Sequence, residues 1–131
     1  MKPYTLLAAV LALGSLPAAV AGDLYLITNK LTALSENDAR DVFLTRKTMS
    51  GSTPLLVVDN ADLQKDFQTK VLHIDGAKYG KLWVNKSFRD GVNPPDVKAS
   101  DAEVVAAVRA TAGTIGYVSM LPPNVTLIAK Y

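Results

Sequence analysis

The stretch TAGTIGYVSM, Thr111 to Met120, places two glycines three residues apart immediately before a β-branched and aromatic run. Such spacing has two interpretations: a cradle for an anionic ligand, or a tight turn that leads into a buried strand. Gly113 suits the left-handed position that follows a helix. A glycine inside a strand, as at Gly116, usually marks a bulge or a close backbone approach. The stretch therefore predicts a structural turn followed by a buried strand at residues 115–119.

Apolar periodicity on either side of this strand predicts the other elements. The predicted strand at residues 54–59 carries apolar side chains on both of its faces, which is typical of a strand covered on both sides. Strands alternate with helices, which predicts an α/β fold: a single small three-layer domain with a mixed, mostly parallel sheet. The last two strands are close enough in sequence to pair as a hairpin. The predicted strands are 24–28, 54–59, 115–119 and 125–129, the helices are 35–43, 61–72, 77–88 and 100–110, and residues 45–53 form a loop.

The N-terminus has the features of a signal peptide. A positive charge at Lys2 precedes an uncharged apolar run, Thr5 to Leu16, and an A-x-A site ends at Ala21. A membrane-spanning helix needs roughly 20 apolar residues, so this run is too short to cross a bilayer. The alternative, an uncleaved anchor, is disfavoured because the polar pair at 22–23 follows the A-x-A site at once. We expect cleavage after residue 21 and one exported domain at 22–131, with no membrane span after cleavage.

Composition excludes several classes of site. The chain has no cysteine, which excludes disulfides, zinc-thiolate sites and thiol nucleophiles. An exported small domain without disulfides suits a bacterial periplasm. A formal net charge of +2 gives no electrostatic case for binding nucleic acid. His73, the single histidine, has no cluster of other ligands around it, and no serine lies in a Gly-x-Ser-x-Gly context. We therefore expect no enzyme activity, no metal and no cofactor.

Three longer segments carry a resemblance to a known family. They are LSENDARDVFLTRKTMSGSTPLLVVDN at 34–60, DFQTKVL at 66–72 and KLWVNKSFRDGVNPPDVKASDAEVVAAVRATAGTIGYV at 81–118. Together they resemble short, exported phosphate-binding-protein-like proteins, which are similar to the periplasmic substrate-binding components of phosphate ABC transporters. The resemblance implies the type 2 periplasmic-binding-protein fold. Two such lobes need roughly 250 residues at typical domain sizes, so this chain would hold one lobe or a reduced form.

The chain departs from this family where phosphate should bind. The phosphate binders follow the strand that ends here at Val58 with an arginine and a Ser-Gly-Thr turn, whereas this chain has DNADL at 59–63. The Thr-Gly-Ser-type turn after the first strand is replaced by TNKLT at 28–32. Asp62 would use the positive end of the following helix for itself. It would also repel a dianion by an energy on the order of a few kcal/mol at an effective dielectric of about 20.

Five polar residues are candidates for ligand binding. Thr28, Asn29 and Lys30 follow the first strand, and open α/β sheets bind ligands beyond the carboxyl ends of their strands. Arg46 lies in a Gly/Ser-rich loop, and Asn60 follows the second strand. Each also has a plainer interpretation: a polar turn, a solvated loop or the cap of a helix.

Two functions from different classes are consistent with these observations. The resemblance implies a periplasmic solute-binding protein for phosphate or another small oxyanion, which would serve an ABC transporter. The alternative is a reduced binding-protein fold that has lost its ligand and contacts a membrane transporter or sensor protein as an accessory module.

The aromatic helix predicted at 77–88 also has two interpretations. Its aromatic side chains pack into the core, or they form the wall of a pocket.

Overall fold

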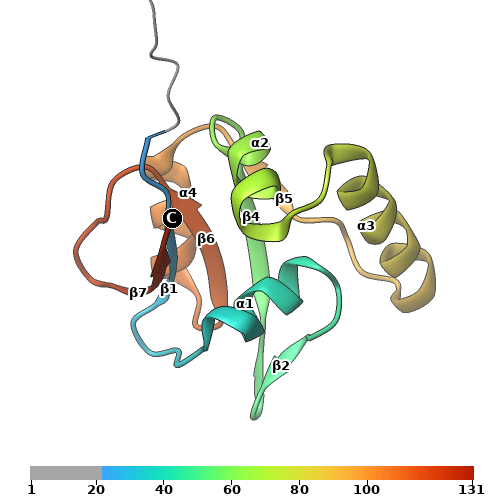
Figure 1. The fold of residues 1–131 in the computed structure, drawn as a ribbon. Helices are drawn as coiled ribbons and strands as arrows, with labels where there is room; N and C mark the ends of the chain where they lie inside the picture. The colour runs from blue at the N-terminus through green and yellow to red at the C-terminus, as the bar shows by residue number, and fades with distance from the viewer. Residues whose placement is uncertain (1–21) are drawn as a thin grey trace, which may run out of the picture.

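Five strands form the main sheet of the computed structural model, which describes residues 22–131 (Figure 1). Their order across the sheet is β5-β4-β6-β1-β7. β4 pairs in parallel with both β5 and β6, whereas β1 pairs antiparallel with both β6 and β7. β1 therefore runs against the other four strands. The strands are β1 (Tyr25–Asn29), β4 (Leu56–Asn60), β5 (Asp96–Lys98), β6 (Thr114–Val118) and β7 (Val125–Lys130).

The position of β1 corrects two expectations. The last two strands do not pair as a hairpin, because β1 lies between them: Tyr25 pairs with Val118 on one side and with Lys130 on the other. The sheet is accordingly mixed and only partly parallel. β1 is buried along most of its length, so it needs a partner on each side, whereas the half-buried β7 suits the edge of the sheet.

Helices cover both faces of this sheet, which gives three layers (Figure 1). Ser35 and Ser100 accept hydrogen bonds from the amides of Asp38 and Glu103 and so begin their helices as the sequence predicts. A small hairpin replaces most of the loop predicted at 45–53. The helices are α1 (Glu36–Phe43), α2 (Gln64–Phe67), the π-helical η4 (Gln68–Leu72), α3 (Gly76–Asp90) and α4 (Asp101–Ala110), and the hairpin strands are β2 (Met49–Ser50) and β3 (Thr53–Pro54).

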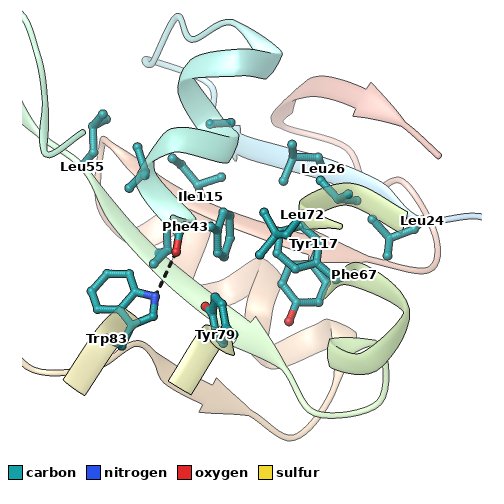
Figure 2. Close-up of a cluster of buried hydrophobic side chains, with 14 residues drawn as sticks. Leu24, Leu26, Phe43, Leu55, Phe67, Leu72, Tyr79, Trp83, Ile115 and Tyr117 are labelled. Carbon is teal, nitrogen blue, oxygen red and sulfur yellow. Dashed lines mark hydrogen bonds between the residues drawn. The ribbon is translucent and has the colours of Figure 1, made fainter. Parts of the chain in front are cut away.

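The core has two parts, one on each face of the sheet. The larger part packs α1, α2, η4 and α3 against the sheet around three aromatic rings, with the Phe67 and Tyr117 rings stacked at 3.9 Å between centroids (Figure 2). The Trp83 indole donates a hydrogen bond of 3.0 Å to the carbonyl of Phe43 and so joins α3 to α1. The smaller part packs α4 on the other face through Ile27, Val58, Val104, Val108 and Val118.

Both glycines of the TAGTIGYVSM stretch are required by close approaches of other atoms. Gly113 has φ +86°, and a Cβ there would lie 2.2 Å from the carbonyl oxygen of Pro54. At Gly116 a Cβ would lie 2.6 Å from a methyl group of Val104 on α4. The stretch is therefore a turn into a buried strand, and its glycines bring the backbone against neighbouring elements.

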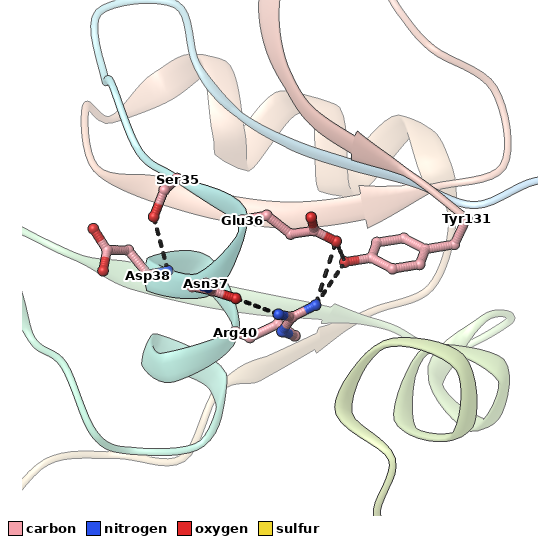
Figure 3. Close-up of polar contacts among 6 residues, drawn as sticks. All are labelled: Ser35, Glu36, Asn37, Asp38, Arg40 and Tyr131. Carbon is pink, nitrogen blue, oxygen red and sulfur yellow. Dashed lines mark hydrogen bonds and ion pairs between the residues drawn. The ribbon is translucent and has the colours of Figure 1, made fainter.

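The end of the chain is held against α1. Tyr131 donates a hydrogen bond to Glu36, and Arg40 donates to both Glu36 (3.3 Å) and the Tyr131 hydroxyl (3.4 Å) (Figure 3). Backbone hydrogen bonds of 3.0 and 2.8 Å also join Leu24 and Tyr131. Within residues 22–131, no helix has the length and apolar character to cross a bilayer. The predicted signal peptide lies outside the described residues.

Candidate functional site

A carboxylate of the protein itself lies at the end of the sheet where β4, β5 and β6 finish, and we call this end the carboxyl edge. Asp101, in the first turn of α4, accepts a hydrogen bond of 2.8 Å from the Asn60 side-chain amide. Its other oxygen accepts from the backbone amide of Ser119 at 3.0 Å and from the Ser119 hydroxyl at 2.6 Å. These three donors, from the end of β4 and from the residue after β6, bind a carboxylate at the N-terminus of α4, and helix N-termini favour anions. Here the protein supplies the anion itself.

The side chain of Asn60, one of the predicted ligand residues, makes three hydrogen bonds within the fold. It is completely buried, and its amide nitrogen also donates to the carbonyl of Tyr117 at 3.1 Å. Its carbonyl oxygen accepts from the amide of Asp62 at 3.2 Å. Asn60 therefore lies at the expected edge, but as a connector between β4, β6 and α4.

Thr28, Asn29 and Lys30 lie at the opposite end of the sheet from Asn60. The expectation that they follow a strand at the ligand-binding edge is wrong, because β1 runs antiparallel to β6. The Thr28 hydroxyl donates to the carbonyl of Thr114 at 2.9 Å, and the Asn29 amide donates to the carbonyl of Val108 at 2.9 Å. Asn29 thereby satisfies a free carbonyl near the end of α4, while Lys30 is exposed.

Arg46 lies in the segment between α1 and β2. Its guanidinium is 3.7 Å from the carboxylate of Asp41, and its side chain is 68% exposed. Exposed pairs of this kind contribute about 0–1 kcal/mol to stability. The five predicted residues therefore do not form one cluster.

A buried carboxylate in β4 was missed by the sequence reasoning. Asp59 is 1% exposed and accepts hydrogen bonds from the hydroxyls of Tyr117 (2.7 Å) and Tyr79 (2.9 Å). Burial raises the pKa of Asp59, against the opposing effects of the Tyr117, Tyr79 and Gln64 side chains. Burial and the neighbouring carboxylate also raise the pKa of both tyrosines. Successive side chains of a strand point to opposite faces, so Asp59 lies on the same face of β4 as Val57, under the helices. This spacing is the signal from which its burial could have been predicted.

Asp59→Asn is expected to change how stability depends on pH. Because the pKa of Asp59 is raised in the folded state, protonation of this side chain stabilises the fold. The full stabilisation is present below the unfolded pKa of about 3.9. This contribution is lost as pH rises through the folded pKa of Asp59. Urea denaturation from pH 3.5 to 8 should therefore show the wild type losing stability relative to Asp59→Asn as pH rises. A constant difference across this range would contradict the burial effect.

Two hollows lie against α3. The larger, the groove, has a volume of about 780 Å³ and runs along β4 between α3, α4 and the β2–β3 hairpin. The smaller, the α3 hollow, has about 430 Å³ and reaches Asp59 and Tyr79. Both are lined by Trp83, Pro94 and Pro95.

The groove is mainly apolar and has one buried amine. The Lys86 side chain is 8% exposed, and its nitrogen lies 3.1 Å from the carboxylate of Asp90. Trp83 and the prolines form apolar walls. In residues 22–131, no group of three or more His, Cys, Asp or Glu side chains is placed to hold a metal ion.

Comparison with known proteins adds no relative from which a function could be transferred. No protein-family model matches the chain, and no curated protein matches it at a significant level.

Proposed function

We propose that this chain is an exported, non-catalytic module similar to one lobe of a type 2 periplasmic binding protein, which contacts a partner protein instead of holding phosphate. The carboxylate of Asp101 carries this proposal, because it uses the donors of Asn60 and Ser119. A dianion at this edge would have to displace that carboxylate and its hydrogen bonds. The partner would be a transporter or sensor in the periplasmic space, as the family resemblance implies.

The groove supports a partner in extended conformation. β5 pairs only with the second half of β4, from Val58 to Asn60, while β6 pairs with β4 from Leu56. β5 does not continue toward the groove, because Pro94 and Pro95 precede it and lack backbone N–H groups. An incomplete strand edge accepts an extended segment by adding main-chain hydrogen bonds.

Apolar side chains surround this open edge. Leu56 is about half exposed, Met49 is 43% exposed and Val92 is 39% exposed, and all three line the groove. Exposed apolar side chains that gather around a groove are typical of protein-interaction surfaces. The occupant that this surface suits is an extended segment of a partner protein with apolar side chains in alternate positions.

A second candidate function is the binding of a small anion in the groove. The observation that favours it is the Lys86 amine, which is nearly buried among apolar walls and has a single carboxylate neighbour, Asp90. A nearly buried ammonium group in such surroundings attracts an anion more strongly than an exposed one does.

Titration with anions distinguishes the two functions. We expect phosphate and sulfate, at constant ionic strength, to leave the melting temperature unchanged. A ligand at 100 times its Kd would stabilise the fold by about 2.7 kcal/mol, which a thermal melt detects readily. A rise that disappears in Lys86→Met would establish the second function, and a rise retained in that variant would contradict both proposals.

Site-specific photo-crosslinking tests the docking surface directly. A photoreactive side chain at Leu56, beside the groove, should form a crosslink to one defined periplasmic or membrane protein. The matched control is Leu31, which is 81% exposed and follows β1 at the other end of the sheet. Equal crosslinking from both positions would contradict the assignment of the groove.

A further inference from the structure

The α3 hollow has a polar floor and apolar walls. Asp59, Gln68 and Tyr79 are all buried, at 1%, 8% and 5% exposure, and all three line it. A carboxylate, an amide and a hydroxyl from three different elements thus converge at the bottom of one depression. Trp83 and the Pro94–Pro95 segment form part of its walls.

Among residues 22–131, no cationic side chain pairs with the carboxylate at this floor. None of the ion pairs among residues 22–131 includes Asp59, whose oxygens are bonded by two neutral hydroxyls. Each carboxylate oxygen can accept two hydrogen bonds, so Tyr79, Tyr117 and the Gln64 side chain leave room for one further donor. Burial alone disfavours the ionised form of Asp59. Buried charges in proteins are normally paired, so an ammonium group in the hollow would stabilise this ionised form.

Two glycines keep the hollow open. Gly76 and Gly80 lie one turn apart on α3, and both line the hollow. A Cβ at Gly80 would have no atom within 4 Å, and one at Gly76 would lie 3.3 Å from the amide oxygen of Gln68. Glycine in a helix costs about 1 kcal/mol relative to alanine, and here it leaves space above the buried polar groups.

We propose that the α3 hollow is a binding site for a small primary amine with an apolar body. The ammonium group donates hydrogen bonds to Asp59 and to the amide oxygen of Gln68. The apolar body lies against Trp83 and the prolines, where the indole also favours a cation. Phosphate and other anions are disfavoured at this site by the same carboxylate. This inference does not rest on the proposed partner-binding function, since it concerns a different hollow and a different ligand.

Benzylamine is a suitable probe, and the protein carries its own reporter. Trp83 is the only tryptophan of the chain and lines both hollows, so its fluorescence reports binding beside α3, and the variants below assign that binding to the α3 hollow. We expect benzylamine at neutral pH to change this fluorescence in a saturable manner and to raise the melting temperature. Benzyl alcohol and benzoate have a similar shape without the positive charge, and we expect each to bind at least about tenfold more weakly.

Two variants test the site, and a third serves as the control. Asp59→Asn keeps the shape of the side chain and should weaken benzylamine binding about tenfold or more. Gly80→Leu places a side chain in the open space and should abolish the fluorescence response while the protein remains folded. Asp62→Asn removes an exposed carboxylate at the sheet edge and should leave binding unchanged.

Several results would overturn the proposal. They are equal binding of benzylamine and benzyl alcohol, unchanged affinity in Asp59→Asn, or no response to benzylamine at tens of millimolar. Loss of binding in Gly80→Leu without any loss in Asp59→Asn would also overturn it, because the hollow would then be a purely apolar site. None of these outcomes depends on the crosslinking or anion experiments, so the two proposals can fail separately.

Discussion

Gly113→Ala is expected to lower the free energy of unfolding by about 3 kcal/mol, the sum of backbone strain and overpacking. The backbone at Gly113 has φ +86°, a conformation that costs a residue with a Cβ about 1–2 kcal/mol. The new Cβ would also lie 2.2 Å from the carbonyl oxygen of Pro54. That oxygen belongs to the backbone of β3, so the clash can be relieved only by moving β3 or the turn before β6. Urea denaturation with linear extrapolation measures the loss.

Gly91→Ala is the matched control for this prediction. Gly91 follows α3 with φ +68°, and a Cβ there would meet no atom within 4 Å. We expect this variant to lose only the cost of the left-handed conformation, about 1 kcal/mol. The difference between the two variants then measures the close approach of β3 to Gly113. Equal losses would show that the turn moves away from Pro54 without cost.

Tyr117→Leu is expected to destabilise the protein by about 3–4 kcal/mol, a loss typical of large-to-small changes in a core. The Tyr117 ring is fully buried and stacks on Phe67, and its hydroxyl donates 2.7 Å to Asp59. Leucine removes the stacked ring and leaves the carboxylate with Tyr79 as its remaining tyrosine donor. Thermal and urea denaturation at neutral pH should both show the loss.

Tyr117→Phe separates the two contributions. This variant keeps the ring against Phe67 and removes only the hydroxyl. We expect the free energy of unfolding to fall by about 1–3 kcal/mol, because the buried carboxylate of Asp59 loses one hydrogen-bond donor. Tyr25→Leu, at a half-buried position in β1, should cost less than either change. If the leucine and phenylalanine variants at 117 were equally stable, stacking on Phe67 would make no measurable contribution.

Most elements could be predicted from the sequence, because their local signals agree with their tertiary surroundings. Ser35 and Ser100 mark the beginnings of α1 and α4 as expected, and the glycines of the TAGTIGYVSM stretch mark the turn into β6. β5 was missed because it has only three residues, which are largely exposed and directly follow two prolines. Its strand character depends on pairing with β4, which local sequence does not encode.

The candidate sites were harder to predict than the elements. The predicted ligand residues Thr28 and Asn29 depended on the direction of β1, and direction is set by long-range pairing. The Asp59 cluster joins residues that are 20 and 58 positions apart, so no local motif announces it. The sequence identified the carboxylates near residue 60 as a departure from a phosphate site, but not that Asp59 is buried under the helices while Asp101 fills the edge.

The central position of β1 has a consequence for how the chain folds. The strand nearest the predicted cleavage site pairs only with β6 and β7, so Tyr25 must find Val118 and Lys130 across most of the chain. Contacts of such large sequence separation slow folding, because the loop must close before any contact is formed. The sheet cannot be completed until β6 and β7 have left the ribosome. The central strand β1 therefore finds both of its partners only after almost all of residues 22–131 have been synthesised.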